Sequence, residues 1–246
     1  DTGNVNNVSI TGTGTVVGNT TFLNAGTLLI NDAAETTTFT GGLTANANSE
    51  LTLQGTLATT NNDMSIGANG LTIAGAGATL TSGNGDITIG GVVTGANKSL
   101  TITSSGTTTL SADLNALSTF VTDAAGGTTL AAGVDITTAS TMTIADALII
   151  SSGGTSILDA GAASTSDITL AAVSGINGGA VENITLDAGA DAGSSIIVTG
   201  AFTDIGTLTI TDATNVELRG ALNVAAYVDT GNVNNVSITG TGTVVG

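Results

Sequence analysis

The chain has 246 residues, contains no Pro, Cys, His or Trp, and carries a net charge of −17 from 19 acidic and two basic side chains. Nucleic acids and anionic membranes attract proteins through Lys and Arg, so this charge argues against both as partners. Without His and Cys, the usual Ser-His and Cys-His nucleophile systems cannot be built. Because 41% of the residues are hydrophobic, the chain is also unlike a disordered protein. We expect a folded protein that is not an enzyme.

A tripeptide with an apolar, a hydroxyl and an apolar residue recurs from the beginning of the chain to its end. Its alternation predicts a half-buried strand, with Leu, Ile or Val inside and Thr or Ser outside. In chain order it occupies residues 8–10, 51–53, 71–73, 87–89, 100–102, 142–144, 168–170, 184–186, 208–210 and 236–238. Residues 28–30 and the region around Phe120 fill the gaps, and the individual spacings lie between 13 and 28 residues.

Clusters of Gly, Asn, Asp and Ser separate these strands and predict turns, where Gly and Asn supply positive φ angles. Further strands are expected at residues 107–110, 128–130 and 196–198. A period near twenty with two or three short strands is typical of a β-solenoid. We therefore predict an all-β, parallel β-solenoid (β-helix) of about eleven coils with roughly 20 residues per coil. Two alternatives remain: an antiparallel sandwich or barrel of some twenty strands, and one helical turn at residues 112–117.

The last eighteen residues, 229–246, repeat residues 1–18 without a change. We interpret residues 1–246 as a single continuous β-solenoid segment: one 228-residue unit and the start of the next. A sandwich gives no reason for such a repeat. A solenoid that continues into itself builds length, so we expect a fibre, a stalk or a surface layer. The partner is then the protein itself, through end-to-end continuation at residues 1–18 and 229–246 and through lateral filament contacts.

The segments SLTITSSGTTTL (99–110) and FVTDAAGGTTL (120–130) resemble the strand repeats of giant bacterial surface proteins. Filamentous-haemagglutinin-like adhesins and autotransporter passengers are the familiar members. The resemblance covers most of the chain and rests on composition and rhythm. It implies an extracellular or cell-surface, right-handed β-helix with an adhesive, matrix or surface-layer role, and it carries over no catalytic residue. The alternative function is an adhesin stalk that presents a binding tip outside this chain. No stretch approaches the roughly 20 apolar residues of a membrane-spanning helix, so we expect no membrane insertion by this segment.

The sequence offers no catalytic or cofactor-binding residue, and calcium is the one metal that we weigh, although none is required. Calcium takes oxygen ligands, and acidic turns could supply them. The acidic pairs are Asp32 with Glu35, Asp187 with Asp191, and Asp204 with Asp212. Residues 83–87 (GNGDI) are similar to a calcium-binding nonapeptide, but no tandem copy follows. The competing interpretation is that each Asp hydrogen-bonds within its own turn.

Outward threonines raise a further alternative, an ice-binding face. The runs at 11–15 and 207–211 have the Thr-x-Thr pattern of such arrays. An ice-binding face needs threonines aligned from coil to coil, and the irregular spacing of the strands predicts that they are not aligned. Threonine also suits any exposed strand face, which is the simpler interpretation.

Overall fold

The computed structural model describes residues 6–46, 50–151, 153–161, 163, 165–176 and 181–244. Every regular element of this described part is a β-strand, and it holds no helix that is long and apolar enough to cross a membrane. The chain winds as a parallel β-solenoid of about ten turns, with about 22 residues per turn. This confirms the predicted fold, and the antiparallel alternative is wrong. The chain divides into two compact units, Asp1–Ser118 (unit 1) and Thr119–Gly246 (unit 2).

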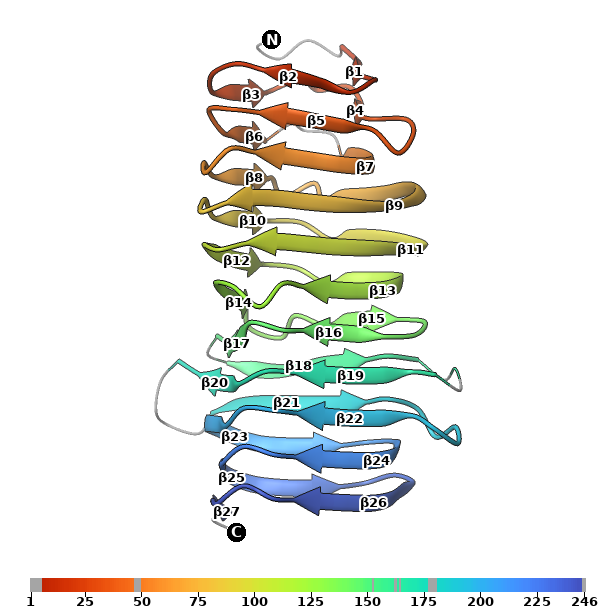
Figure 1. Cartoon of the computed structure of the whole chain (residues 1–246), viewed down its shortest axis with the longest axis vertical. Helices are drawn as coiled ribbons and strands as arrows, with labels where there is room; N and C mark the ends of the chain where they lie inside the picture. Colours follow the sequence, from red (N-terminus) through yellow and green to blue (C-terminus); the bar gives the residue numbers. More distant parts are fainter. Residues whose placement is uncertain are drawn as a thin grey trace. The chain divides into compact units, whose positions relative to one another are not determined.

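Unit 1 consists of strands of 3 to 13 residues that are stacked one coil above the next (Figure 1). Its strands are β1 (Val8–Ile10), β2 (Gly14–Val16), β3 (Thr20–Phe22), β4 (Leu28–Ile30), β5 (Thr36–Phe39), β6 (Leu43–Ala45), β7 (Leu51–Thr59), β8 (Met64–Ile66), β9 (Leu71–Gly83), β10 (Ile87–Ile89), β11 (Val93–Ser104) and β12 (Thr107–Leu110). The next strand, β13 (Leu114–Thr122), contains the boundary between the units.

Three parallel ladders give each coil of unit 1 three sides. The first ladder runs through β1, β4 and the first halves of β7 and β9, and the second through β2, β5 and their second halves. The third ladder runs through β3, β6, β8, β10 and β12. Register partners are separated in the sequence by one coil length, as in Val8 with Leu28 and Met64 with Ile87.

Unit 2 repeats this three-sided plan with more variable coil lengths. Its strands are β14 (Gly127–Leu130), β15 (Ile136–Thr138), β16 (Met142–Ile144), β17 (Ala147–Ile150), β18 (Gly154–Asp159), β19 (Asp167–Leu170), β20 (Val173–Gly175), β21 (Glu182–Asp187), β22 (Ser195–Val198), β23 (Phe202–Ile210), β24 (Ala213–Leu218), β25 (Leu222–Asp229), β26 (Val233–Ile238) and β27 (Thr243–Val244). The step from one register partner to the next is short where Ile205 pairs with Val224 and long where Val173 pairs with Phe202.

Inward apolar residues form continuous columns in each unit. In unit 2, Met142, Ile168 and Ile196 are register partners on successive coils, and each side chain has 0% exposure. In unit 1, Leu57 and Leu80 stack in the same way. The predicted alternation of Leu and Ile inside with Thr outside is therefore confirmed. Since no coil can bury its apolar side alone, stacking supplies the core.

The irregular spacing of the tripeptides has a simple origin, because they lie in all three ladders. In unit 1, residues 71–73 belong to the first ladder, residues 87–89 to the third and residues 100–102 to the second. The short spacings in the sequence therefore measure distance around a coil, and not the step from one coil to the next.

Residues 112–117 do not form the helical turn that was considered for them. Residues 114–117 lie in strand β13, where Leu114 and Leu117 are both fully buried. Residues three apart in a regular strand point to opposite sides. The left-handed conformation of Ala116, with φ of 53°, breaks the alternation and lets both leucines turn inward. Burial of the two leucines outweighs the local helical propensity.

Candidate functional site

Carboxylate and amide side chains near the coil corners hydrogen-bond to the backbone of the neighbouring coil. The Oδ1 atom of Asp86 accepts the Thr107 N–H at 2.7 Å, and the Asp86 N–H donates to Oδ1 of Asp63 at 3.0 Å. We call such a bond a coil clamp. Others join Asn7 to Thr27, Asn61 to Asn84, Asp135 to Ile157, Asp167 to Ser195, Asn183 to Thr207 and Asp212 to Asn232, acceptor first. Asp86 directly precedes β10 and Thr107 begins β12, so this clamp extends the bonding into a turn, whereas the clamp between Asp167 and Ser195 joins two register partners.

The interpretation that each Asp serves its own turn holds for only some of them. Asp159 accepts the N–H of Gly161, and Asp187 accepts that of Gly189, both two residues ahead. Asp86, in the segment that is similar to a calcium-binding nonapeptide, instead serves the next coil. The sequence alone could not show this, because an acceptor for the next coil and an acceptor for the same turn are the same residue type.

The first acidic pair considered for calcium, Asp32 with Glu35, is joined through the backbone. Oε2 of Glu35 accepts the Asp32 N–H at 3.2 Å. Backbone hydrogen bonds from Gly12 and Asp32 lower the pKa of Glu35. In the part of the chain that the structure describes, no group of three or more His, Cys, Asp or Glu could hold a metal ion.

In the other two acidic pairs, the carboxylates have interactions that their spacing in the sequence does not predict. Burial raises the pKa of Asp187, and the charges of Asp159 and Asp212 raise it further. Asp159 and Asp212, which raise this pKa, lie on the coils on either side of Asp187. Asp204 adopts a left-handed conformation with φ of 57°, whereas Asp212 is the acceptor of a coil clamp. Stacking of coils therefore brings together carboxylates that are far apart in the sequence, while Asp159 and Asp187 also accept hydrogen bonds within their own turns.

Asp146 is a buried carboxylate in unit 2 that the sequence analysis missed. Its side chain is 4% exposed, Oδ1 accepts the Thr122 hydroxyl at 3.0 Å, and Oδ2 accepts the Thr128 hydroxyl at 2.9 Å. Burial raises its pKa, although the two hydroxyl groups oppose that shift. The carboxylate ties two threonines of one coil to the coil that follows, so its role is structural.

Outward threonines align over a few coils and are then interrupted. Thr56 and Thr79 are register partners in unit 1, and Thr101 continues the row. In unit 2, the row that begins with Thr143 and Thr169 continues with Ile197. Loops of different length absorb the irregular spacing, so unequal coils do not prevent alignment. In unit 2, such apolar interruptions break the flat hydroxyl array that an ice-binding face would need.

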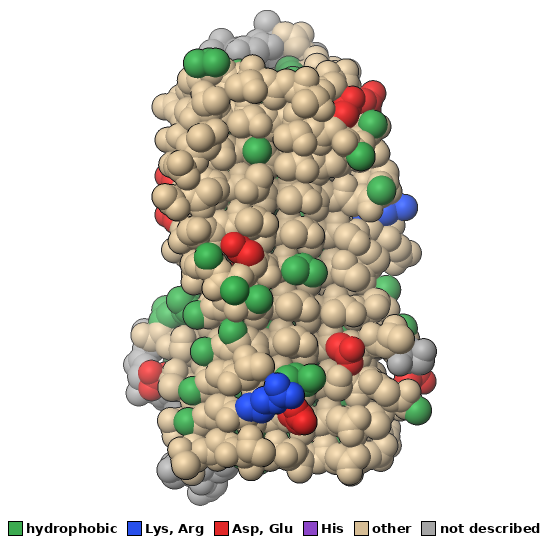
Figure 2. Space-filling model, in the orientation of Figure 1, with side chains coloured by type: hydrophobic (Ala, Val, Ile, Leu, Met, Phe, Trp, Pro, Cys, Tyr) green, Lys and Arg blue, Asp and Glu red, His purple; other side chains and the backbone are tan. Residues whose placement is uncertain are grey.

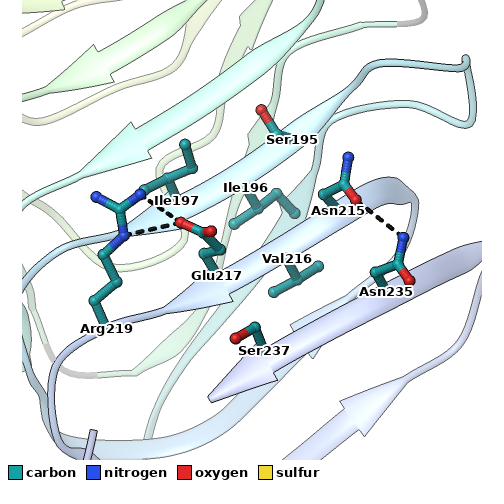
Figure 3. A pocket seen from close by; sticks show the side chains of 9 residues that line it. All are labelled: Ser195, Ile196, Ile197, Asn215, Val216, Glu217, Arg219, Asn235 and Ser237. Atoms are coloured by element: carbon teal, nitrogen blue, oxygen red, sulfur yellow. Dashed lines mark hydrogen bonds and ion pairs between the residues drawn. The ribbon is translucent and has the colours of Figure 1, made fainter. Parts of the chain in front are cut away.

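On the face shown in Figure 2, polar uncharged side chains and backbone cover most of the surface, and acidic side chains lie scattered singly or in small groups. A shallow hollow of about 410 Å³ lies on unit 2 over β22, β24 and β26 (Figure 3). Asn235 donates to Asn215 across it at 3.1 Å, and the Arg219 guanidinium contacts Glu217. Both charged side chains are about half exposed, so this ion pair contributes at most about 1 kcal/mol.

The outer edge of β26 exposes residues that belong to the core columns. Val236 and Ile238 are 44% and 47% exposed, whereas their register partners Val216 and Leu218 are 1% and 2% exposed. No described strand pairs with the other side of β26. At the beginning of unit 1, β1 has the sequence of residues 236–238 of β26, and among the described strands it pairs with β4. The two copies of the repeat, with their strands β1 and β26, are the candidate functional site.

Comparisons with protein-family models, with curated proteins and with solved structures found no match.

Proposed function

We propose that this chain is a structural segment of an extracellular fibre, stalk or surface layer, built from β-solenoid units joined in tandem or head to tail. One observation carries the proposal. The eighteen-residue repeat contributes a strand at both ends, and each copy pairs with a neighbouring coil at the same step in the sequence: Val8 with Leu28, and Val216 with Val236. If this segment joins two units, the coils before and after it therefore have the same length.

The mechanical properties follow from the stack. Backbone hydrogen bonds of parallel ladders run from coil to coil, so tension along the stack is shared by three ladders at once. Apolar columns hold each coil to its neighbours, and coil clamps such as Asp86 to Thr107 hold the corners. Outward Thr and a net charge of −17 keep the surface hydrated and make separate copies repel each other sideways. The proposal assigns the chain no catalytic step.

The extracellular part of the proposal rests on two further points. Fibre and stalk proteins outside the cell need no Lys-rich surface for nucleic acids, and this chain has two basic residues. The rhythm of its strands also resembles that of giant bacterial surface proteins. Surface labelling of intact cells with a membrane-impermeant reagent tests this location, and a protein that is labelled only after lysis would contradict it.

Two measurements test the structural role. The first is the mass of the native polypeptide on a denaturing gel, confirmed by mass spectrometry. The second is electron microscopy of the purified chain over a range of concentrations. We expect either a native mass of several hundred kDa, as a tandem array requires, or rods that lengthen with concentration at constant width. A native mass near 23.5 kDa together with single short particles at every concentration would overturn the proposal.

A further inference from the structure

The outward side chains on one face of unit 1 are nearly all threonines. This face belongs to the second ladder, which runs through β2, β5 and the second halves of β7, β9 and β11. Residues i and i+2 of a strand point to the same side, so the face has two columns of outward positions. The first column holds Thr36, Thr56, Thr79 and Thr101, and the second holds Thr15, Thr38, Ala58, Thr81 and Thr103. We call these nine positions, eight of which are threonine, the threonine face.

The same ladder in unit 2 provides a comparison within the chain. Its two columns hold Thr143, Thr169, Ile197, Glu217 and Ser237, and Asp167, Ser195, Asn215 and Asn235. A mixture of residues therefore satisfies the needs of an outward strand face, and Ile and Val favour strands as Thr does. Strand propensity gives no reason for threonine at eight of the nine positions in unit 1. A ligand that contacts both the methyl and the hydroxyl group of each side chain does give a reason.

The core holds the threonines of this face in fixed positions. Leu57, Leu80 and Ile102 lie in three successive strands of the ladder, each beside outward threonines, and all three are buried. Because successive side chains of a strand point to opposite sides, these buried residues fix the direction of their outward neighbours. Threonine is branched at Cβ and restricted at χ1, so its methyl and hydroxyl groups are ordered before a ligand binds. All eight threonines are half-buried or exposed, which leaves them accessible.

The threonine face is uncharged in a strongly acidic chain. The strand segments that form it contain no acidic or basic residue, and they are residues 14–16, 36–39, 56–59, 78–82 and 100–104. In Figure 2, charged side chains lie at the margins of this part of unit 1 and not over β5, β9 and β11. The net charge of −17 is therefore carried elsewhere. A charged side chain orders water around itself, so an uncharged face is suited to a regular layer of water.

The register sets the spacing of the hydroxyl groups in two directions. Threonines of one column are about 4.8 Å apart, because that is the distance between paired strands. The two threonines of one strand are about 6.6 Å apart, which is two residues at about 3.3 Å each. Water molecules at the surface of ice form a regular grid with repeats close to these two distances. We infer that the threonine face binds ice. This inference goes beyond the fibre proposal and does not require copies of the chain to join.

Binding uses both groups of the threonine side chain. Each hydroxyl group donates to one water of the ice lattice and accepts from another, and each methyl group lies between lattice waters. Ala58 removes one hydroxyl group from the second column and keeps a methyl group there. An ice crystal that is covered by bound protein grows only between the bound molecules, where its surface becomes curved. Because a curved surface melts at a lower temperature, the crystal stops growing over a range of temperatures below its melting point.

The gap between the melting and the freezing temperature of a single ice crystal, observed by microscopy in a solution of the purified chain, tests the inference. Thr79→Lys places a long charged side chain near the centre of the threonine face. Thr88→Lys is the matched control, because Thr88 is also an outward, half-buried threonine but lies in β10 of the third ladder. Thr103→Lys, at an exposed position of the threonine face, provides a second variant that the fold tolerates more easily. Circular dichroism checks that each variant keeps its strand content.

We expect the natural chain and Thr88→Lys to show the same gap and faceted crystals, and Thr79→Lys and Thr103→Lys to lose most of the gap. A natural chain that leaves the freezing temperature unchanged overturns the inference, and so does an equal loss in Thr79→Lys and Thr88→Lys. Dimers that Thr79→Lys dissociates in sedimentation, together with an unchanged freezing temperature, would assign the face to a second copy and overturn the inference as well. None of these outcomes depends on end-to-end joining, so the fibre proposal is tested separately.

Discussion

The carboxylate of Asp146 is buried and accepts hydrogen bonds from two threonine hydroxyl groups. Removing it leaves the Thr122 and Thr128 hydroxyls buried without that partner. An unpaired buried polar group costs about 1–3 kcal/mol. We expect Asp146→Ala to lower the free energy of unfolding by about that amount, measured by urea denaturation. Asp229→Ala, at an exposed carboxylate, is the matched control and should stay within about 0.5 kcal/mol. An equal loss in both variants would contradict this role of Asp146.

Two raised pKa values predict that mild acid stabilises the fold. The pKa values of Asp146 and Asp187 are raised by burial, so the folded chain holds these protons more tightly than the unfolded chain does. This contribution is complete below the ordinary Asp pKa of about 3.9 and is lost as the pH rises through the raised values. The pKa of Glu35 is lowered, so its own contribution is lost only as the pH falls below its ordinary 4.5. Measurements therefore stay between pH 7 and about 4.5.

In that window we expect the urea midpoint of the natural chain to rise as the pH falls at constant ionic strength. The double variant Asp146→Asn with Asp187→Asn should show a smaller rise, because an amide does not titrate. Relief of the overall charge affects both proteins alike, so the difference between the two slopes isolates these carboxylates. Identical slopes would show that neither group contributes.

The alternation of buried and more exposed residues along each strand can be predicted from this sequence. In the triplet 168–170, Ile168 and Leu170 are buried and Thr169 between them is half-buried, as the pattern predicts. Asp146 could not be predicted, because its neighbours Thr122 and Thr128 come from a preceding coil that no local pattern identifies. Residues whose roles depend on the neighbouring coil are recognised only when the register is known.

Where the chain turns from one strand to the next, we expect a coil clamp to stabilise the fold through the hydrogen-bond acceptor of its side chain and not through its charge. Asp86 accepts the exposed corner N–H of Thr107, and a typical hydrogen bond contributes about 0.5–1.5 kcal/mol. We expect Asp86→Ala to cost that amount and Asp86→Asn to cost less than about 0.5 kcal/mol. Urea denaturation gives the totals, and hydrogen exchange of the Thr107 amide shows whether the loss is local. If the two variants lose the same stability, the clamp acts through its charge.

The repeat offers the same substitution in two identical sequence contexts. Gly14→Ala places its Cβ in open space, whereas Gly242→Ala drives it into the Leu222 carbonyl. Alanine favours a strand over glycine by about 0.5–1 kcal/mol where there is room. We expect Gly14→Ala to be neutral or stabilising, and Gly242→Ala to weaken the coil formed by β25 and β27. Faster hydrogen exchange in residues 222–238 of the Gly242→Ala variant alone is the measurement that decides.

The strands could be predicted from the sequence, but their assignment to sides of the coil could not. A strand such as β10 (Ile87–Ile89) has the same pattern as β9 at residues 71–73, although the two lie in different ladders. The turns between them contain no signal for which side comes next. The candidate site was predictable in one respect: an exact repeat marks the two ends as equivalent. Its register with β4 and β24 required the structure.

For the molecule as a whole, charge opposes the end-to-end joining that we propose. Every copy carries a net charge of −17, so two approaching copies repel each other over the Debye length. That length falls from about 30 Å at 0.01 M salt to about 10 Å at 0.1 M. We expect end-to-end joining to accelerate as sodium chloride is raised over this range, measured by the rate at which light scattering increases. Joining that slows with added salt would show that attraction between charges, and not burial of apolar surface, brings the copies together.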